Sequence, residues 1–231
     1  MIRSVVRRRM MAATALLLGL AVAPALPQAS GSAAAPAAWE PGRTTACRVG
    51  AWTRNETAEP ITVHAEPSAA SAIVGRLPTT GADGSTAYDY SVTFEITAAT
   101  GEWLQISGAT DANNANDDRA ARPVYSGTGW IRADAARFVI QSARGYQRPD
   151  ATSPRLVDLG TDWATELGTL TRILACADEW VLVDLTLHSR RGPGARLTEL
   201  PAAERQHRRA WFRGVCPSEE TTCDMRSVDR E

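Results

Sequence analysis

The 231-residue chain contains no lysine, only 6% aromatic residues and just three histidines. Its 25 cations are therefore all Arg, and they nearly balance 26 acidic residues to give a net charge of −1. A chain this close to neutral lacks the overall positive field with which proteins hold nucleic-acid phosphates, so no nucleic-acid partner is expected. With 44% hydrophobic and 22% charged residues, the composition is that of a globular protein, which excludes a mostly disordered chain and a multi-span membrane protein. The length predicts one or two domains.

The sequence has one long apolar run, and it lies at the N-terminus. Four Arg within the first nine residues precede an apolar stretch over 10–25 that ends in small residues. This order predicts a secretory signal peptide over 1–29, and the run is short of the roughly 20 residues that span a bilayer, which argues against the alternative of an uncleaved anchor. Residues 30–45 are rich in Ala, Pro, Gly and Ser and predict a disordered linker. We therefore expect a secreted or periplasmic protein of the cell envelope, with no stable membrane insertion after cleavage.

Four cysteines follow the predicted signal: Cys47, Cys176, Cys216 and Cys223. An even number of cysteines in an exported chain predicts disulfides, and four cysteines allow three pairings. Cys216 and Cys223 flank a short polar loop that a local bridge could close, which leaves Cys47 to pair with Cys176. Alternatively, Cys176 pairs within the C-terminal half and Cys47 is left over or pairs outward. The sequence has neither a CxxC or HxxxH pair for zinc nor a DxDxDG loop for calcium, so no cofactor or metal is expected.

A repeat runs through the rest of the chain, at an offset of roughly 80 residues that predicts two copies of one module. Both copies read as an apolar strand, a small turn, a Glu-Trp pair and a second apolar strand, which is typical of a β-hairpin. Alternation of apolar residues in these segments predicts an all-β protein. The anchors that recur are Pro67 and Pro149, Trp103 and Trp180, and Trp130 and Trp211. We expect the four Trp to begin strands and to fill the cores of two small barrels.

These residues resemble the bacterial SH3-like (SH3b) domain. In that family an Asn/Thr-Val-Arg-x-x-Pro-Ser strand and turn precede an x-Gly-x-Leu edge, a Trp-Leu-x-Ile strand and a closing Gly-Trp-Val. Residues 61–77, the Glu-Trp hairpin and the Gly-Trp strand follow this order, although His64 stands where the family has Arg and Ala210 replaces the Gly before the second closing Trp. The Cys-flanked segment 216–223 also resembles the tail of some exported proteins of this type.

The resemblance implies two small SH3-like β-barrels in tandem after the signal peptide and the linker. Their ranges are 46–142 and 143–223, with a C-terminal tail over 224–231. It also implies a binding module without catalytic residues. The function we expect is that of an exported, non-enzymatic protein that recognises cell-wall peptidoglycan or other envelope material.

Two segments are candidate ligand sites. Tyr88 and Tyr90 lie in a polar loop of the first copy, where the early loops of an SH3-like barrel wall a groove, and their rings could stack on sugar or peptide or could instead pack on the barrel rim. In the second copy, residues 186–209 hold six Arg against two Glu. Arg190 and Arg191 in this loop are predicted to pair with an anionic polymer. The alternatives are an intramolecular contact with the acidic first copy or a solvated loop.

Other functions remain open at this stage. Trp52 and Trp163 are outside the repeat and are candidate ligand platforms, with packing in the core as the favoured alternative. A periplasmic adaptor or inhibitor could bind a partner peptide through the two tyrosines. A hydrolase would need a free thiol at Cys176 or Cys216 with His207 as its base.

Overall fold

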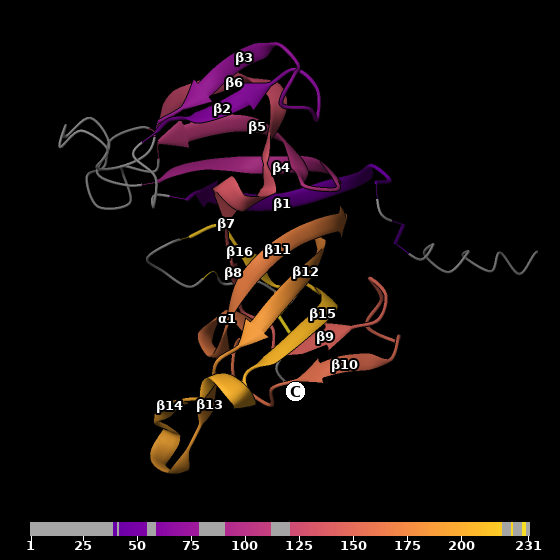
Figure 1. Cartoon of the computed structure of the whole chain (residues 1–231), viewed down its shortest axis with the longest axis vertical. Coiled ribbons are helices and arrows are strands. Elements are labelled where there is room, and N and C mark those ends of the chain that lie inside the picture. Colours follow the sequence, from indigo (N-terminus) through magenta and orange to yellow (C-terminus); the bar gives the residue numbers. More distant parts are fainter. Residues whose placement is uncertain are drawn as a thin grey trace, which may run out of the picture. The chain divides into compact units, whose positions relative to one another are not determined.

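The computed structural model describes residues 39–40, 42–54, 59–78, 91–111, 121–218, 223 and 228–229. All of them lie in one compact unit, Pro36–Glu231. The predicted signal peptide and the first part of the predicted linker lie outside the described residues, as does most of the predicted tail. Strands dominate (Figure 1), so the all-β prediction is confirmed. The described residues include one short α-helix, α1 (Ala164–Leu167), which is far too short to cross a bilayer.

The first sheet has seven antiparallel strands in the order β3-β2-β6-β5-β4-β1-β7. Their bounds are β1 (Thr45–Thr53), β2 (Ile61–His64), β3 (Ile73–Leu77), β4 (Val92–Thr100), β5 (Trp103–Asp111), β6 (Arg122–Arg132) and β7 (Ala136–Arg137). A single 3₁₀ turn, η1 (Ala133–Ala135), connects β6 to β7. Alternation builds this sheet as expected, because Val92, Phe94 and Ile96 are buried on one face while Glu95 between them is exposed.

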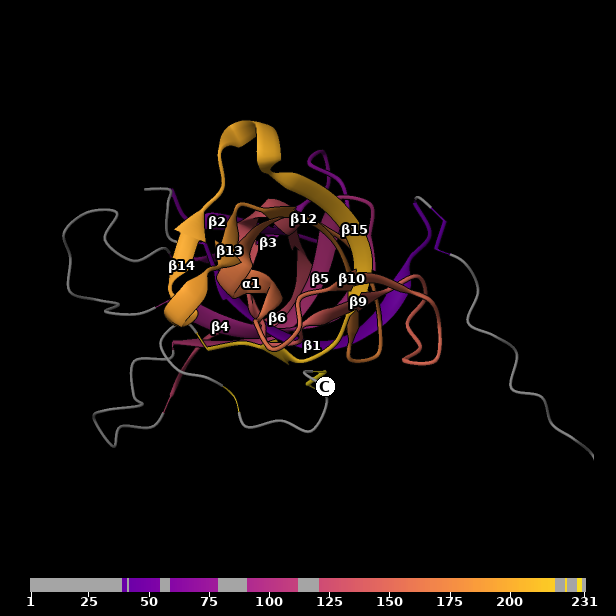
Figure 2. The ribbon, with the colours of Figure 1, turned by 90° about the horizontal axis from the view of Figure 1, so that it is seen from below.

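The second sheet has five antiparallel strands in the order β10-β9-β15-β12-β11 and is strongly curved (Figure 2). Its strands are β9 (Arg144–Tyr146), β10 (Arg155–Asp158), β11 (Gly168–Ala177), β12 (Trp180–Leu187) and β15 (Gln206–Phe212). Two small pairs accompany it, β13 (Ser189–Arg191) with β14 (Leu197–Glu199) and β8 (Val139–Ile140) with β16 (Val215–Cys216). The short turns η2 (Pro193–Ala195) and η3 (Ala202–Glu204) flank β14.

The two sheets repeat one strand order. The order β3-β2-β6-β5-β4 matches β10-β9-β15-β12-β11 strand for strand, so the sequence repeat is also a repeat of topology. Even the irregularities coincide, since a bulge lies between Ile96 and Ala98 in β4 and another between Ile173 and Ala175 in β11. Bulges bend a strand and re-aim its side chains, so these paired bulges give both sheets the same curvature at the same place.

A compensating pair of substitutions explains why Ala210 departs from the Gly-Trp pattern. A Cβ at Gly129 in β6 would approach the Val63 side chain to 2.5 Å. In the second sheet the glycine is on the other strand of the pair: it is Gly145 in β9, and a Cβ there would approach the Ala210 side chain in β15 to 2.7 Å. Each sheet thus keeps one glycine at this close approach and a larger residue opposite it.

The main core is continuous across both sheets. It includes Phe94 and Ile131 from the first sheet and Val181 and Phe212 from the second, and β11 contacts both β1 and β4. The prediction that the four repeat Trp begin strands and fill the barrel cores is only partly right. Trp103 and Trp180 begin β5 and β12 but are only half-buried. Near the C-terminal ends of β6 and β15, and buried but outside the main core, lie Trp130 and Trp211. Their neighbours Ile131 and Phe212 point into the core, and alternation turns Trp130 and Trp211 to the opposite face of each sheet, which we call the outer face.

Pairings between distant segments tie the two copies together. β8 falls inside the predicted first domain, 46–142, but it pairs with β16 near the end of the second copy. β1 begins at Thr45, inside the segment 30–45 that was predicted as linker, and Trp39 from the same segment packs on the second sheet. The folded part therefore begins earlier than the composition suggested.

Candidate functional site

The outer face of the first sheet carries an aromatic and cationic ladder built around Trp103. The His64 ring meets Trp103 edge-on, at 5.3 Å between centroids and 81° between planes. The Arg132 guanidinium lies 5.5 Å from the Trp103 centroid and pairs with Glu102 at 2.8 Å. Trp130 completes the ladder, since it lies opposite His64 in the strand register.

The second sheet repeats this ladder residue by residue around Trp180. Tyr146 meets Trp180 edge-on at 5.5 Å and 83°, and Arg213 lies 5.4 Å from its centroid. Trp211 lies opposite Tyr146, as Trp130 lies opposite His64. Arg213 donates two hydrogen bonds to Asp229, at 2.8 and 2.5 Å, and these bonds raise the pKa of the guanidinium. The repeated Glu-Trp and Trp-x-Arg sequences thus encode one structural unit, a Trp held between an aromatic edge and an anchored cation.

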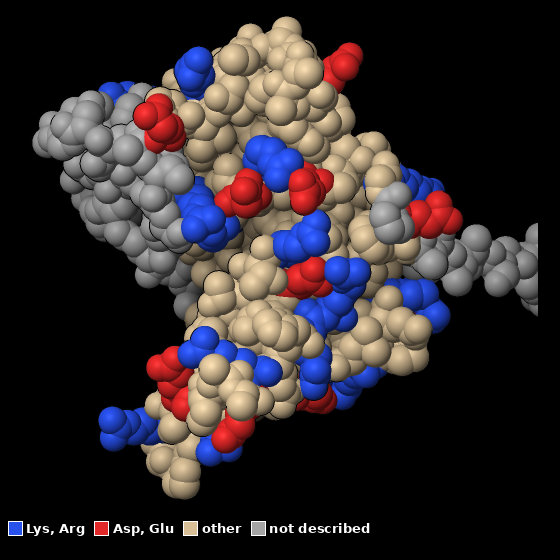
Figure 3. All heavy atoms as spheres, viewed as in Figure 1, with Lys and Arg blue, Asp and Glu red and all other residues tan. Residues whose placement is uncertain are grey.

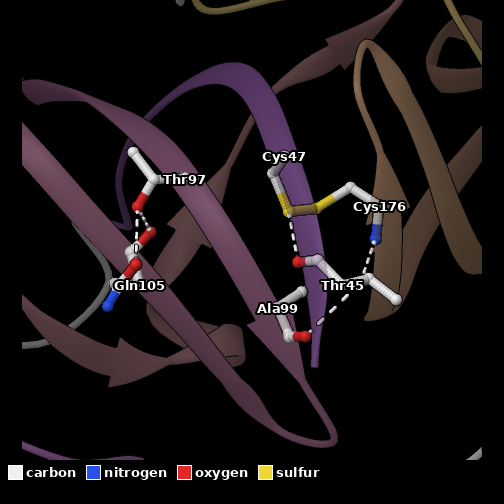
Figure 4. Close-up of a disulfide and its surroundings, with 6 residues drawn as sticks. All are labelled: Thr45, Cys47, Thr97, Ala99, Gln105 and Cys176. Carbon is white, nitrogen blue, oxygen red and sulfur yellow. Dashed lines mark hydrogen bonds between the residues drawn. A yellow bond between two sulfur atoms is a disulfide. The ribbon is translucent and has the colours of Figure 1, made fainter. Parts of the chain in front are cut away.

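The surroundings of the two ladders differ. In the first sheet, Thr97 donates a hydrogen bond to the Gln105 side chain at 3.0 Å (Figure 4), so its outer face is polar here. The positions that match these two in register hold Leu174 and Leu182, which are buried with Trp211 in a separate apolar cluster. The second sheet has therefore replaced a polar pair by an apolar patch.

Trp39 packs on that apolar patch, from the segment that was predicted as linker. The Arg209 guanidinium lies 5.6 Å from the Trp39 centroid, and Asp184 accepts two hydrogen bonds from Arg209 at 2.7 and 2.8 Å. These bonds raise the pKa of Arg209 and hold its charge in place beside the indole. The sequence contains a signal for this contact that composition concealed, because Trp39 is the one aromatic residue between 30 and 45.

A cavity of about 340 Å³ opens between this N-terminal segment and the second sheet. Its walls are two indoles, a proline ring, short polar side chains and two charged groups. The lining residues are Trp39, Arg43, Thr44, Thr45, Ala46, Pro149, Cys176, Ala177, Asp178 and Trp211. Asp178 is already paired with Arg48 at 2.9 Å. The Arg43 side chain is exposed and has no ion pair within the described part of the chain, so the cavity presents one uncommitted positive charge.

A disulfide and a short backbone pairing fix the base of this cavity. Cys47 and Cys176 are bridged, with their Cα atoms 5.2 Å apart (Figure 4). The Thr45 hydroxyl accepts a hydrogen bond from the Cys176 amide at 3.2 Å and donates one to the Ala99 carbonyl at 3.4 Å. The Arg48 amide donates to the Asp178 carbonyl at 2.8 Å. The N-terminal segment is thus anchored beside the end of β11.

The structure forms the first of the disulfide pairings considered above. Cys216 and Cys223 close the short loop, and Cys47 and Cys176 join the two copies. All four sulfurs are in disulfides, so a thiol nucleophile at Cys176 or Cys216 is not available in this state. The imidazole of His207 instead forms a 2.8 Å hydrogen bond with the Thr186 hydroxyl. Among the described residues, no three His, Cys, Asp or Glu side chains gather as a metal site would require.

The predicted ligand residues have different outcomes. Tyr88 and Tyr90 lie outside the described residues. Arg191 makes intramolecular ion pairs with Asp162 and Glu166, and these hydrogen bonds raise the pKa of its guanidinium. Both acids belong to the second copy. The alternative of an intramolecular contact is therefore right in kind, but its expected partner, the acidic first copy, is wrong.

Most of the remaining basic loop is also paired. Arg190 lies 3.9 Å from Glu204, and Arg205 lies 2.7 Å from Glu199. On the face shown in Figure 3, acidic side chains lie among the cations. The positive excess of 186–209 is therefore largely used to hold the β13–β14 hairpin and its neighbours in place.

The two Trp candidates outside the repeat are not isolated platforms. Trp52 packs against the main core. Trp163 is half-buried at the start of α1, where its carbonyl accepts the amides of Glu166 and Leu167.

A second cavity, of about 200 Å³, lies beside the first ladder. Its charged lining residues are Glu102, Arg132, Asp134 and Arg172. Glu102 pairs with both Arg132 and Arg172, at 2.8 and 3.2 Å, so the charges of this cavity are matched by one another. The cavity at Trp39 is the better candidate site, because it combines aromatic walls with an uncommitted cation.

Comparisons with protein-family models, with curated proteins and with solved structures gave no match for this chain.

Proposed function

We propose that this protein is an exported, non-enzymatic binding protein with tandem SH3-like domains, and that it recognises cell-wall peptidoglycan or other envelope material. The observation that carries this proposal is the aromatic-walled cavity on the second sheet, with Trp39 and Trp211 in its lining. Support for export comes from the two disulfides, which persist in an oxidising compartment, and from the charged and apolar order of the N-terminus.

The chemistry of the cavity suits wall material. Sugar rings present an apolar face of C–H groups, and indole rings offer large, rigid surfaces on which such faces can stack. Peptidoglycan also carries carboxylates, on its acidic sugar and on its peptides, and guanidinium groups bind carboxylates with good geometry. Arg43 can supply this contact at the rim of the cavity.

Co-sedimentation with purified sacculi tests the proposal. Mature protein, with both disulfides intact, is mixed with sacculi at low salt, and we expect most of it to pellet. A matched variant replaces Leu174 by Thr and Leu182 by Gln, the pair that the first sheet carries in the same register. This variant should pellet several-fold less because it removes the patch on which Trp39 packs. Wild-type protein that stays in the supernatant at low salt would show that wall binding is not its function.

A second candidate function is that of an envelope adaptor or inhibitor that binds a partner peptide. Edge strands β3 and β10 expose large apolar residues, with Ile73 55%, Val74 45% and Leu156 49% accessible. An open sheet edge with exposed apolar side chains can add a peptide as a further strand. Crosslinking in cells separates the two functions, because a single protein crosslinked at Val74 or Leu156 supports the adaptor and glycan attachment at Trp39 supports wall binding.

A further inference from the structure

We propose that the cavity on the second sheet binds a single sugar ring that carries a carboxylate, and that the N-terminal arm, comprising Trp39, Glu40 and residues 42–44, determines this specificity. Trp39 contacts the ring, the buried Trp211 forms part of the cavity wall, and Arg43 pairs with the carboxylate. This inference rests on the proposed function and names the chemical class of the ligand.

The size of the cavity selects one ring. Its volume of about 340 Å³ is near the lower end of the range for small-molecule sites. An extended oligomer would have to leave the cavity after its first unit. The aromatic contacts therefore recognise a single residue, and any neighbouring units lie outside.

The polar groups in the lining suit a sugar better than a hydrocarbon ring. The Asp178 carboxylate can accept hydrogen bonds from sugar hydroxyls, and the Thr44 hydroxyl can both donate to them and accept from them. The apolar part of the lining comes from the rings of Trp39, Trp211 and Pro149. A purely apolar ring would leave these polar groups without partners once water is displaced, which is unfavourable.

The charges in the lining select a carboxylate. Asp178 is neutralised by Arg48, whose guanidinium lies 2.9 Å away, so Arg43 supplies the net positive charge. One guanidinium matches one carboxylate in charge and in its two-point geometry. A dianionic phosphate would bring a second negative charge toward Asp178 without a second free cation to balance it.

The arm is held in position before any ligand arrives. Arg209, itself anchored by Asp184, lies 5.6 Å from the Trp39 ring centroid. The Thr100 hydroxyl donates a hydrogen bond to the Gly42 carbonyl at 3.0 Å, and Gly42 adopts a positive φ of 82° that suits glycine. Trp39 and Arg43 therefore stand on either side of a fixed turn, which limits the entropy lost when the ring binds.

The experiment titrates oxidised mature protein with two sugars that share a ring. N-acetylmuramic acid carries a carboxylate, and N-acetylglucosamine does not. Binding is followed by intrinsic Trp fluorescence and by NMR. We expect the acidic sugar to bind about tenfold more tightly, in line with a charge-assisted pair. The Arg43→Gln variant should lose this preference, because its affinity for the acidic sugar should fall about tenfold. The Trp39→Ala variant should weaken both sugars.

Arg196→Gln is the matched control, because Arg196 is exposed on the β13–β14 hairpin, away from the cavity lining, and it should bind as wild type does. Circular dichroism and a thermal scan check that each variant is folded. Equal affinity for the two sugars, or an Arg43→Gln variant that keeps the preference, would overturn the inference. Tighter binding of N-acetylphenylalanine than of either sugar would also overturn it, since the site would then take an amino-acid ring. If the protein is retained on sacculi but shows no sugar preference, only the acidic-sugar inference is wrong. If it shows the sugar preference but is not retained on sacculi, the proposed wall-binding function is wrong.

Discussion

The outer faces of the two sheets share a frame and differ in what covers it. Each has a Trp held between an aromatic edge and an Arg, at Trp103 in the first sheet and Trp180 in the second. Around this frame the first sheet is polar, with the Thr97–Gln105 hydrogen bond, while the second is apolar and holds Trp39. The duplicated frame stabilises both sheets, so it is the divergence around it, and not the repeat, that points to a binding site.

The same comparison applies to the disulfide. Ala99 in β4 and Cys176 in β11 occupy matching positions in the repeat, and the second sheet alone is bridged there, to Cys47. This bridge closes a loop with a sequence separation of 129, against 7 for Cys216–Cys223. Closing a long loop removes more conformational entropy from the unfolded chain than closing a short one. The Cys47–Cys176 bridge is therefore expected to add more to the free energy of unfolding than the Cys216–Cys223 bridge.

Removing the long-range disulfide should produce the largest loss of stability. Replacing both Cys47 and Cys176 by Ala gives the second sheet the residue that the first already has, so little strain is expected. Chain entropy predicts a loss of about 5 kcal/mol of unfolding free energy, against about 2.5 kcal/mol for the double variant at Cys216 and Cys223. Urea denaturation of both double variants measures the difference. If the Cys216 and Cys223 double variant lost more unfolding free energy, local packing and not loop closure would determine how much each bridge stabilises the fold.

Exchanging the polar and apolar pairs tests the divergence directly. Leu174→Thr with Leu182→Gln should cost about 2–3 kcal/mol, because two buried apolar side chains are lost and the new polar pair satisfies only itself. Trp39 should also become more accessible to acrylamide quenching, since it loses its platform. The reciprocal variant, Thr97→Leu with Gln105→Leu, should leave quenching unchanged because Trp39 packs on the second sheet and not at these positions of the first. Unchanged quenching in both variants would show that Arg209 alone holds Trp39.

Sequence patterns predicted the local parts of this fold well. The Glu-Trp hairpins came out correctly because short turns and two-residue alternation are encoded within a few residues. The face of the four Trp was predicted wrongly for a physical reason: both faces of each sheet carry large apolar side chains, so apolar character alone does not say which face is the core. A bulge after Ile96, repeated after Ile173, also shifts the alternation that such an argument counts on.

The site depended on contacts that no local pattern contains. Trp39 was assigned to a linker because its neighbours are Ala and Pro, although its platform lies in β11 and β12. Arg190 and Arg191 suggested an anion site because charge was counted along the chain, whereas the acids that pair with Arg191 come from Asp162 and Glu166. Net charge in a segment says little when the partners lie in another part of the fold.

The two ladder arginines should differ in a smaller but measurable way. Arg213 and its partner Asp229 are mostly buried, with side chains 27% and 11% accessible, while Arg132 and Glu102 are 47% and 53% accessible. Arg213→Gln should therefore cost about 1–2 kcal/mol, and Arg132→Gln no more than about 0.5 kcal/mol, since exposed ion pairs are screened by solvent. Chemical denaturation of both variants gives the comparison, with Arg196→Gln as a surface control. Equal losses would mean that the contact with the Trp ring, which both share, outweighs the ion pair.

The smallest expected effect is a pH dependence confined to the second sheet. Tyr146 takes the position that His64 takes in the first, and burial, with a further contribution from Asp229, raises the pKa of its phenol. A raised pKa means that the folded state binds this proton more tightly than the unfolded state does. The contribution of Tyr146 to stability is therefore complete below the unfolded pKa of about 10 and is lost as the pH rises through the folded value. Denaturation at pH 8 and at about pH 10.5 should show a loss in wild type that is smaller in Tyr146→Phe, because arginine stays charged throughout and the substitution removes only the titrating group. If the two proteins lose the same stability over this range, the ladder tolerates a phenolate, and the charges of Arg144, Arg155 and Arg213 around Tyr146 then offset its burial.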